Sequence, residues 1–195
     1  MHGDHGAGSP ESPTVWTIGH GALSTEAIAA TLRAAEVGIL VDIRRFPGSR
    51  RSPHLARERL AADLPALGIA YEWAGEALGG RRSPRPGPTR HTAWQDRAFR
   101  GYADHTDSAV FRAAVDGLVG RARAGERLAL MCAELDWRRC HRRLVADALT
   151  VRGVAVVHLR VGRSPEPHGP HPDLRADPAG WPLWEAREGS GRSAG

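Results

Sequence analysis

Residues 37–44 read VGILVDIR: a glycine after the first residue, then an apolar run that carries a carboxylate and ends in a guanidinium. A helix that ends at a glycine and leads into a buried strand has this pattern, because glycine readily takes the left-handed conformation past a helix C-terminus. The same pattern recurs around Gly68 and Gly153, and Gly125 stands before another apolar run. We therefore predict left-handed glycines at positions 38, 68, 125 and 153, each between a helix and a buried strand.

Alternation of helices with short apolar strands is typical of a parallel sheet that is covered on both faces. The sequence predicts an α/β fold: a three-layer sandwich with a mostly parallel sheet of about five strands and helices on both faces. Ser24, with Glu26 in the first turn, predicts the start of the first helix. The predicted strands are 15–18, 39–43, 69–73, 128–132 and 154–159, and two further helices are predicted at 92–102 and 108–123.

The chain has 195 residues, of which 41% are hydrophobic and 25% charged, enough apolar material for one domain and too ordinary a composition for general disorder. We expect a disordered N-terminal tail at residues 1–13 and a single α/β domain at 14–162. Prolines and glycines make 163–195 a C-terminal tail without long regular elements, which Trp181 and Trp184 would dock onto the domain.

Composition also narrows the class of protein. No apolar stretch approaches the ~18 residues of a membrane span, and the N-terminal residues do not resemble a secretory signal. Two cysteines do not make a disulfide scaffold, so we expect a cytoplasmic protein without a membrane partner. The net charge of +5 would suit a nucleic acid, but all 27 basic residues are arginine, which a GC-rich genome explains equally well.

The unusual residues follow the predicted strands, where ligands bind in open α/β sheets. Five loops carry them: 19–21, 42–51, 75–80, 132–141 and 160–163. Because the carboxyl ends of parallel strands share one edge, we predict a pocket at that edge, lined by these loops.

The segment 131–142, MCAELDWRRCHR, carries both cysteines. A thiol at a strand end or a helix N-terminus, flanked by arginines, is a candidate for thiolate chemistry. Cys132 and Arg138 match the C-x5-R loop of thiolate enzymes, although Glu134 and Asp136 within it would repel an anion. An alternative is a metal site formed by Cys132, Cys140 and His141, with His20 or His158. Because C-x7-C-H is not a standard ligand spacing, the sequence assigns no metal ligand and no cofactor. The remaining alternatives are a redox pair and two buried thiols that only pack.

Asp42 interrupts an otherwise buried strand, so its charge must be paired or functional. Arg44 or Arg142 could be its partner, and a structural ion pair and a catalytic role are equally compatible with the pattern. Two arginine clusters, at 44–59 and 81–90, suit an anionic group, and nearby aromatic residues could stack a base. A solvated arginine-rich surface is the alternative.

Four separated motifs in one order resemble a bacterial family catalogued as domain of unknown function 488. They are TIGH at 17–20, LVDIR at 40–44 with PGSR at 47–50, LGG at 78–80, and MCAE at 131–134 with CHR at 140–142. The resemblance runs from about Val15 to Leu159 and leaves the activity open. It implies that the functional positions are His20, Asp42, Arg44, Ser49, Arg50, Gly79, Gly80, Cys132, Glu134, Cys140, His141 and Arg142.

From these patterns we expect an enzyme that acts on a phosphorylated or nucleic-acid-derived substrate. The expected catalytic residues are Asp42, Glu134 and His141 for proton transfer and Cys132 and Cys140 for a thiolate. The expected ligand-binding residues are His20, Arg44, Ser49, Arg50, Gly79, Gly80 and Arg142. The alternatives are a non-catalytic nucleic-acid-binding module, whose affinity would fall steeply with salt, and a metalloprotein that uses the two cysteines and His141.

Overall fold

The computed structural model describes residues 12–48 and 52–187 of the chain. They form a mixed sheet of six strands in the order β3-β2-β4-β1-β5-β6, in which all pairings are parallel except that of the edge strand β6. This confirms the predicted α/β fold. The strands are β1 (Thr14–Gly19), β2 (Ile39–Asp42), β3 (Ala70–Trp73), β4 (Leu128–Cys132), β5 (Ala155–Leu159) and β6 (Glu166–Pro167).

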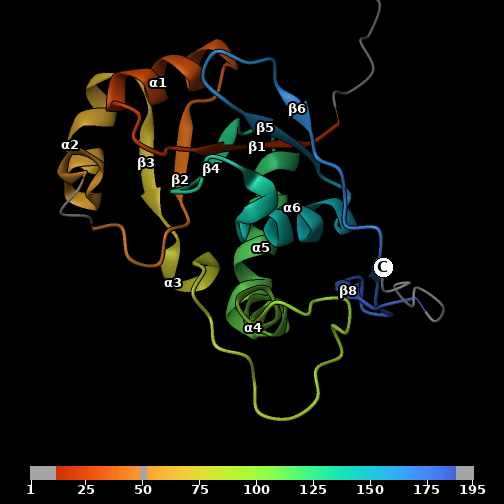
Figure 1. Cartoon of the computed structure of the whole chain (residues 1–195). Helices are drawn as coiled ribbons and strands as arrows, with labels where there is room; N and C mark the ends of the chain where they lie inside the picture. The colour runs from red at the N-terminus through yellow and green to blue at the C-terminus, as the bar shows by residue number, and fades with distance from the viewer. Residues whose placement is uncertain (1–11, 49–51, 188–195) are drawn as a thin grey trace, which may run out of the picture.

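Helices cover both faces of the sheet (Figure 1). On one face α1 (Thr25–Ala34) and α2 (Arg57–Ala66) bury an apolar cluster that includes Ile28 and Leu64. The other face carries α3 (Gly75–Leu78), α4 (Arg97–Thr106), α5 (Ala109–Arg123) and α6 (Arg142–Val151). Two short 3-10 helices complete the layers: η1 (Pro53–Leu55) packs with α2 on the first face, and η2 (Trp137–Arg139) precedes α6.

Neighbouring residues of each strand point to opposite faces, and this alternation decides which side chains can meet. On β4, Leu128, Leu130 and Cys132 join the cluster under α5 and α6, whereas Ala129 and Met131 join the cluster under α1 and α2. Asp42 pairs in register with Met131 and therefore lies on the α1–α2 face. Asp42 and Cys132 thus stand on opposite faces of the sheet.

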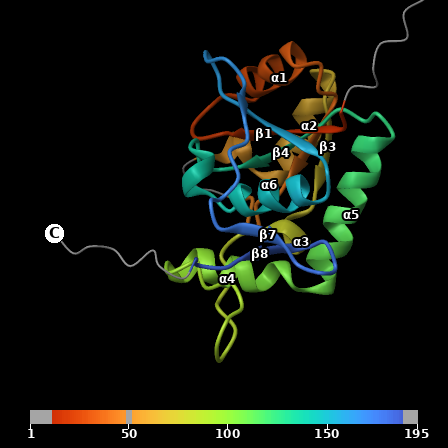
Figure 2. The same ribbon diagram turned by 90° about the vertical axis from the view of Figure 1, so that its right-hand side faces the viewer.

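The segment after β5 packs onto the domain. β6 pairs with β5, and β7 (Leu174–Ala176) with β8 (Pro182–Trp184) forms a hairpin that lies between α6 and α4 in Figure 2. Trp184 is fully buried in the cluster under α5 and α6 and donates from Nε1 to Asp147 Oδ2 on α6 (2.7 Å). The predicted domain boundary at 162 stays a prediction, but residues up to 184 contribute to this core.

The helix ends follow the predicted pattern at three of four glycines. Gly68, Gly125 and Gly153 have φ between 78° and 85°, and the residue after each donates its backbone N–H to the helix carbonyl five residues earlier. The prediction for Gly38 is wrong: Glu36 takes the left-handed position at φ 53°, because α1 ends two residues sooner. The helix predicted at 92–102 begins instead at Arg97, where Asp96 caps the N–H groups of Ala98 and Phe99.

The Gly38 and Gly68 positions provide a matched test of this difference. Gly68→Ala should lower the free energy of unfolding by about 1 kcal/mol, because alanine is strained in the left-handed region. Gly38→Ala should cost less than half as much, because φ is not positive there and no atom lies within 4 Å of the added methyl group. Urea unfolding of both variants measures the two costs, and equal costs would contradict the assignment of the helix end to Glu36.

Candidate functional site

A pocket of about 260 Å³ lies at the carboxyl edge of the sheet, as the sequence predicted. Among the described residues, the segments that follow β2, β3 and β4 line it together with α4, and the loops after β1 and β5 are not part of the lining. In the sheet β5 lies beyond β1, away from β2 and β3, and the chain after β1 leads to α1 on the opposite face. The lining residues are Arg44, Arg45, Phe46, Gly80, Arg81, Ala98, Phe99, Tyr102, Cys132, Ala133, Glu134, Arg139, Cys140 and His141.

Cys132, Cys140 and His141 meet in this pocket. Cys132 ends β4, whereas Cys140 and His141 stand at the N-terminus of α6. The Nδ1 atom of His141 lies 3.6 Å from Cys140 Sγ and 3.8 Å from Cys132 Sγ. One ligand atom from each of the three residues lies within 4.8 Å of the others, and both thiols are free. The sequence assigned no metal ligand, because a C-x7-C-H spacing does not reveal that the chain turns back here.

The hydrogen bonds of His141 fix which nitrogen faces the sulfurs. His141 Nε2 lies 3.2 Å from the Ile43 carbonyl oxygen, which can only accept, so Nε2 carries the proton. In the neutral ring Nδ1 then offers its lone pair to the two sulfur atoms. Gly80 leaves room beside it: a Cβ at position 80 would lie 2.8 Å from Nδ1.

The two thiols differ in acidity. The hydrogen bond from Cys132 lowers the pKa of Cys140 well below its ordinary value, and His141 and Arg142 add to the effect against burial. That same hydrogen bond, burial and the negative charge on Cys140 raise the pKa of Cys132 well above its ordinary value. Within the pair Cys140 is therefore the more acidic thiol, and the N-terminus of α6 also favours negative charge at this position.

Arg142 is 1% exposed and ties the pocket loop to the sheet. Its NH2 donates to the Glu134 carbonyl and its NH1 lies 3.3 Å from Thr17 Oγ1. Arg142 is therefore occupied by the protein rather than open to a ligand. The Glu134 carboxylate is exposed at the pocket, with its backbone held in place by this contact.

Asp42 and Arg44 form a buried ion pair. Asp42 is fully buried and accepts from Arg44 Nε (2.9 Å), Arg44 NH2 (2.6 Å) and the Tyr71 hydroxyl (2.8 Å). Arg44 also donates to the Leu55 carbonyl and to His20 Nε2 (3.1 Å). Burial and the neighbouring Arg44 lower the pKa of His20 to about 4, so it is neutral. This group sits outside the thiol cluster and fastens β2 to η1.

The remaining expected residues divide into three groups. Gly79 and Gly80 lie at the pocket, where Gly79 packs so closely against Arg45 that a Cβ would lie 2.6 Å from the Arg45 Cβ. Ser49 and Arg50 lie outside the described residues. Arg138 of the C-x5-R match does not turn to Cys132; it stacks on Trp137 and pairs with Glu166.

A buried chain of hydrogen bonds, which sequence reasoning missed, leads away from Arg142. Thr17 Oγ1 lies 2.7 Å from His158 Nδ1, His158 Nε2 lies 3.0 Å from His168 Nδ1, and His168 Nε2 lies 2.8 Å from Asp147 Oδ1. Because the Asp147 carboxylate only accepts, His168 donates to it from Nε2. His158 is therefore not a neighbour of the thiols. The sequence does contain one signal for this chain of hydrogen bonds: Asp147 interrupts the apolar run 144–149. As with Asp42, a carboxylate in a buried run must be paired or functional.

Two pocket-lining aromatic residues were also missed. Tyr102 is buried on α4 and donates to the Leu78 carbonyl (2.5 Å), and Phe99 stands one helical turn away from it. They come from a helix rather than from a strand end, so the rule used to search the sequence did not point to them.

We expect Asp42→Ala to lower the free energy of unfolding by about 3–5 kcal/mol, because it leaves the buried Arg44 without its counter-charge. Asp63→Ala, which removes an exposed ion pair with Arg59, should cost at most about 1 kcal/mol. Urea denaturation measures both, and similar costs for the two variants would show that the Asp42–Arg44 pair does not hold this region together.

The histidine chain predicts a stability that depends on pH. Burial lowers the pKa of His158 to about 2, from an ordinary value near 6.5. Its neutral form therefore stabilises the fold fully above pH 6.5, and this stability is lost as pH falls from 6.5 toward 2, where only the unfolded chain takes the proton. Between pH 7 and pH 5 the loss should be about 2 kcal/mol from this residue. Urea unfolding at pH 7 and pH 5 measures this loss. In His158→Gln the decrease in the free energy of unfolding between the two pH values should be smaller than in the wild type by about 2 kcal/mol. An equal decrease in both proteins would show that His158 is not the buried neutral group responsible.

Comparison with known proteins identifies a family and no individual relative. A family profile described as "Domain of unknown function DUF488" matches residues 24–149, more than half of the chain. No curated protein and no solved structure matches the chain.

Proposed function

The chain belongs to the DUF488 family, whose description assigns no activity, so we propose a function from the chemistry of the pocket itself. We propose that the protein is a metalloenzyme. Cys132, Cys140 and His141 would bind a zinc ion at the base of the pocket. The pocket would accept a phosphorylated or nucleic-acid-derived substrate above it.

The observation that carries this proposal is the spacing of the three ligand atoms. With Zn–S bonds of about 2.3 Å and Zn–N bonds of about 2.0 Å, a tetrahedral site has its sulfur and nitrogen atoms about 3.6 Å apart. The distances from His141 Nδ1 to the two sulfurs, 3.6 and 3.8 Å, agree with that value. The bond from Nε2–H to the Ile43 carbonyl is the usual support of a histidine ligand.

Three protein ligands with a free fourth position are typical of catalytic rather than structural zinc sites. No fourth His, Cys, Asp or Glu ligand joins the group within residues 12–48 and 52–187. Bound zinc would supply an activated water molecule or polarise a substrate oxygen. Glu134, an exposed residue that lines the same pocket, would be the group that accepts a proton.

The rim of the pocket supports an anionic substrate. Arg45, Arg81 and Arg139 line it, and the Phe46 side chain there is 63% exposed. Arg81 has a φ of 58°, and its carbonyl accepts from Arg45 NH1 (3.0 Å), so the backbone is strained at this edge. A non-catalytic nucleic-acid-binding module would instead need arginines over an open face. The grouping of these arginines around the cysteines therefore favours an enzyme.

Covalent thiolate catalysis is the second candidate, favoured by the 3.6 Å between Cys140 Sγ and a histidine nitrogen. Against it, Cys140 is 2% exposed, which leaves a substrate little access to the sulfur. The two candidates differ in whether the thiols carry a metal.

Free thiols also suit the reducing cytoplasm, the compartment that we propose for the protein. None of the helices in the described part of the chain has the length and apolar character to span a membrane.

Metal analysis of the full chain, purified under reducing conditions without a His-rich tag, tests the proposal. About one zinc ion per chain should be present, or should bind tightly when zinc is added, as a Cys2His set provides. Cys140→Ser and His141→Gln should lose it, and so should Gly80→Ala, whose methyl group would press on the His141 ring. Replacement by cobalt should give sulfur-to-metal absorption bands.

His105→Gln is the matched control. His105 is half-buried close to the pocket and donates to the Ala77 carbonyl, outside the thiol cluster, so this variant should keep the metal. A wild-type protein that stays free of metal in excess zinc would overturn the metal proposal. Rapid alkylation of Cys140 in that protein would then favour thiolate catalysis.

A further inference from the structure

A second pocket adjoins the first and shares Arg45 with it. Its volume is about 340 Å³, and it lies where the loop after Gly80 crosses α4. The lining residues are Arg45, Arg82, Ser83, Arg85, Gly101, Asp104 and His105. We propose that this second pocket binds a phosphate group of the substrate, beyond the part of the substrate that lies over the cysteines.

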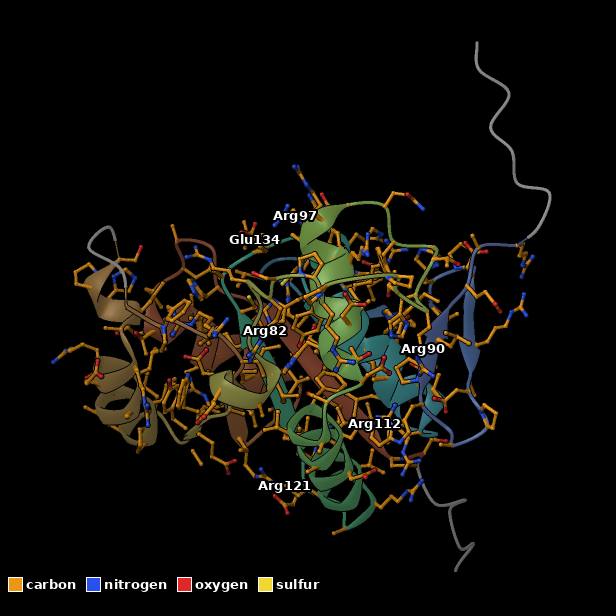
Figure 3. All side chains as sticks on the ribbon, turned by 90° about the horizontal axis from the view of Figure 1, so that it is seen from below. Arg82, Arg90, Arg97, Arg112, Arg121 and Glu134 are labelled. Carbon is orange, nitrogen blue, oxygen red and sulfur yellow. The ribbon has the colours of Figure 1, made fainter. Side chains whose placement is uncertain are left out.

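The pocket holds more positive than negative charge, with three arginines and one carboxylate among its lining residues. Arg45, Arg82 and Arg85 form no ion pair with a carboxylate in residues 12–48 and 52–187. By contrast, Arg90 and Arg112 lie on the other side of α4 in Figure 3 and both pair with Asp107 and Asp177. Three guanidinium groups that line one pocket without an ion pair repel one another, and a bound anion would relieve that repulsion.

The positive charge of the arginines also affects the pKa values of neighbouring groups. Burial and Arg45 lower the pKa of Arg82, and burial, Arg82, Arg45 and Arg85 lower the pKa of His105. The acid of the pocket, Asp104, is 4% exposed and accepts from the backbone N–H of Arg85 and the hydroxyl of Thr89. Asp104 thus holds the loop at residues 85–89 in place through these hydrogen bonds. Its single negative charge leaves the positive charge of the three arginines in excess.

Two of the guanidinium groups are held in place before any ligand arrives. Arg82 donates from Nε to the Gly79 carbonyl (2.9 Å) and from NH2 to the Glu76 carbonyl. Arg45 donates from NH1 to the Arg81 carbonyl (3.0 Å). Their remaining N–H groups, the exposed Arg85 and the Ser83 hydroxyl make a set of donors that suits the several oxygens of a phosphate. Fixed donors lose little conformational entropy on binding, which favours a specific site over a diffuse basic surface.

The shared Arg45 gives the two pockets a common wall, so one substrate can occupy both. This part of the inference rests on the proposed function, because it assumes that the reacting group lies over the cysteines. A free phosphate monoester and the backbone of a single-stranded nucleic acid offer the same chemistry to these arginines. The second pocket is therefore assigned to phosphate, and experiment separates the two sources.

Calorimetric titration of the full chain with inorganic phosphate at low salt tests this site directly. We expect saturable binding that weakens about tenfold in Arg85→Gln, the loss expected for one charge-assisted hydrogen bond. Ser83→Asp, which adds a negative charge and removes no arginine contact, should abolish binding. Arg175→Gln breaks only an exposed pair with Glu185 and should bind phosphate like the wild type. Unchanged affinity in Arg85→Gln and Ser83→Asp would overturn the proposal.

Two further arms separate this inference from the metal site and identify the source of the phosphate. Cys140→Ser should keep its phosphate affinity while losing metal, and Ser83→Asp should keep metal while losing phosphate. Loss of phosphate binding in metal-free Cys140→Ser would place the phosphate on the metal and overturn the second site. A short single-stranded oligothymidylate that binds more than tenfold tighter than phosphate, and again depends on Ser83 and Arg85, would identify a nucleic-acid strand. Equal or weaker binding would identify a small phosphorylated molecule.

Discussion

The buried guanidinium of Arg142 is the constraint on which the site depends. It stands at the start of α6 with 1% of its surface exposed, and no carboxylate pairs with it in the part of the chain that the structure describes. Carbonyl oxygens of residues 134 and 135 and the hydroxyl of Thr17 accept its protons instead. A buried positive charge favours negative charge nearby, and after Cys132 and His141 it is Arg142 that lowers the pKa of Cys140 against burial. The hydrogen bonds from Arg142 NH2 to the carbonyls of residues 134 and 135 also hold the loop between the two cysteines.

The histidine chain extends this arrangement to the C-terminal segment. Hydrogen bonds connect Thr17 through His158 and His168 to Asp147, which also accepts from Trp184. His168 and Trp184 belong to the proline-rich C-terminal segment and both contact Asp147 on α6, so this segment packs against α6. The pocket and the distant C-terminal hairpin therefore share one connected polar network around α6.

Sequence reasoning reached the strands, the sheet type and the edge that carries the pocket, because periodicity and helix-ending glycines are local properties. It was wrong at Gly38, because the same local pattern is compatible with two helix ends. At Gly68 the glycine takes the left-handed position, whereas α1 ends earlier and Glu36 takes that position instead of Gly38. It also left Asp42 undecided between structure and catalysis. The register of β2 with β4 places Asp42 on the face opposite Cys132, where Arg44 and Tyr71 satisfy it.

The sequence by itself determined that this is an α/β domain of the DUF488 family, with both cysteines, a histidine and many arginines near one edge of a parallel sheet. Only the tertiary structure decided which of these side chains meet. Strand order brings the segments after β2, β3 and β4 together and leaves the loop after β5 aside, while the chain after β1 leads to α1 on the opposite face of the sheet. Arg44 and Arg142 are buried by contacts with distant parts of the chain, whereas Arg45, Arg82 and Arg85 have no carboxylate partner in the described residues. The physical reason is that burial and charge pairing depend on contacts between residues far apart in the chain, which no local pattern encodes.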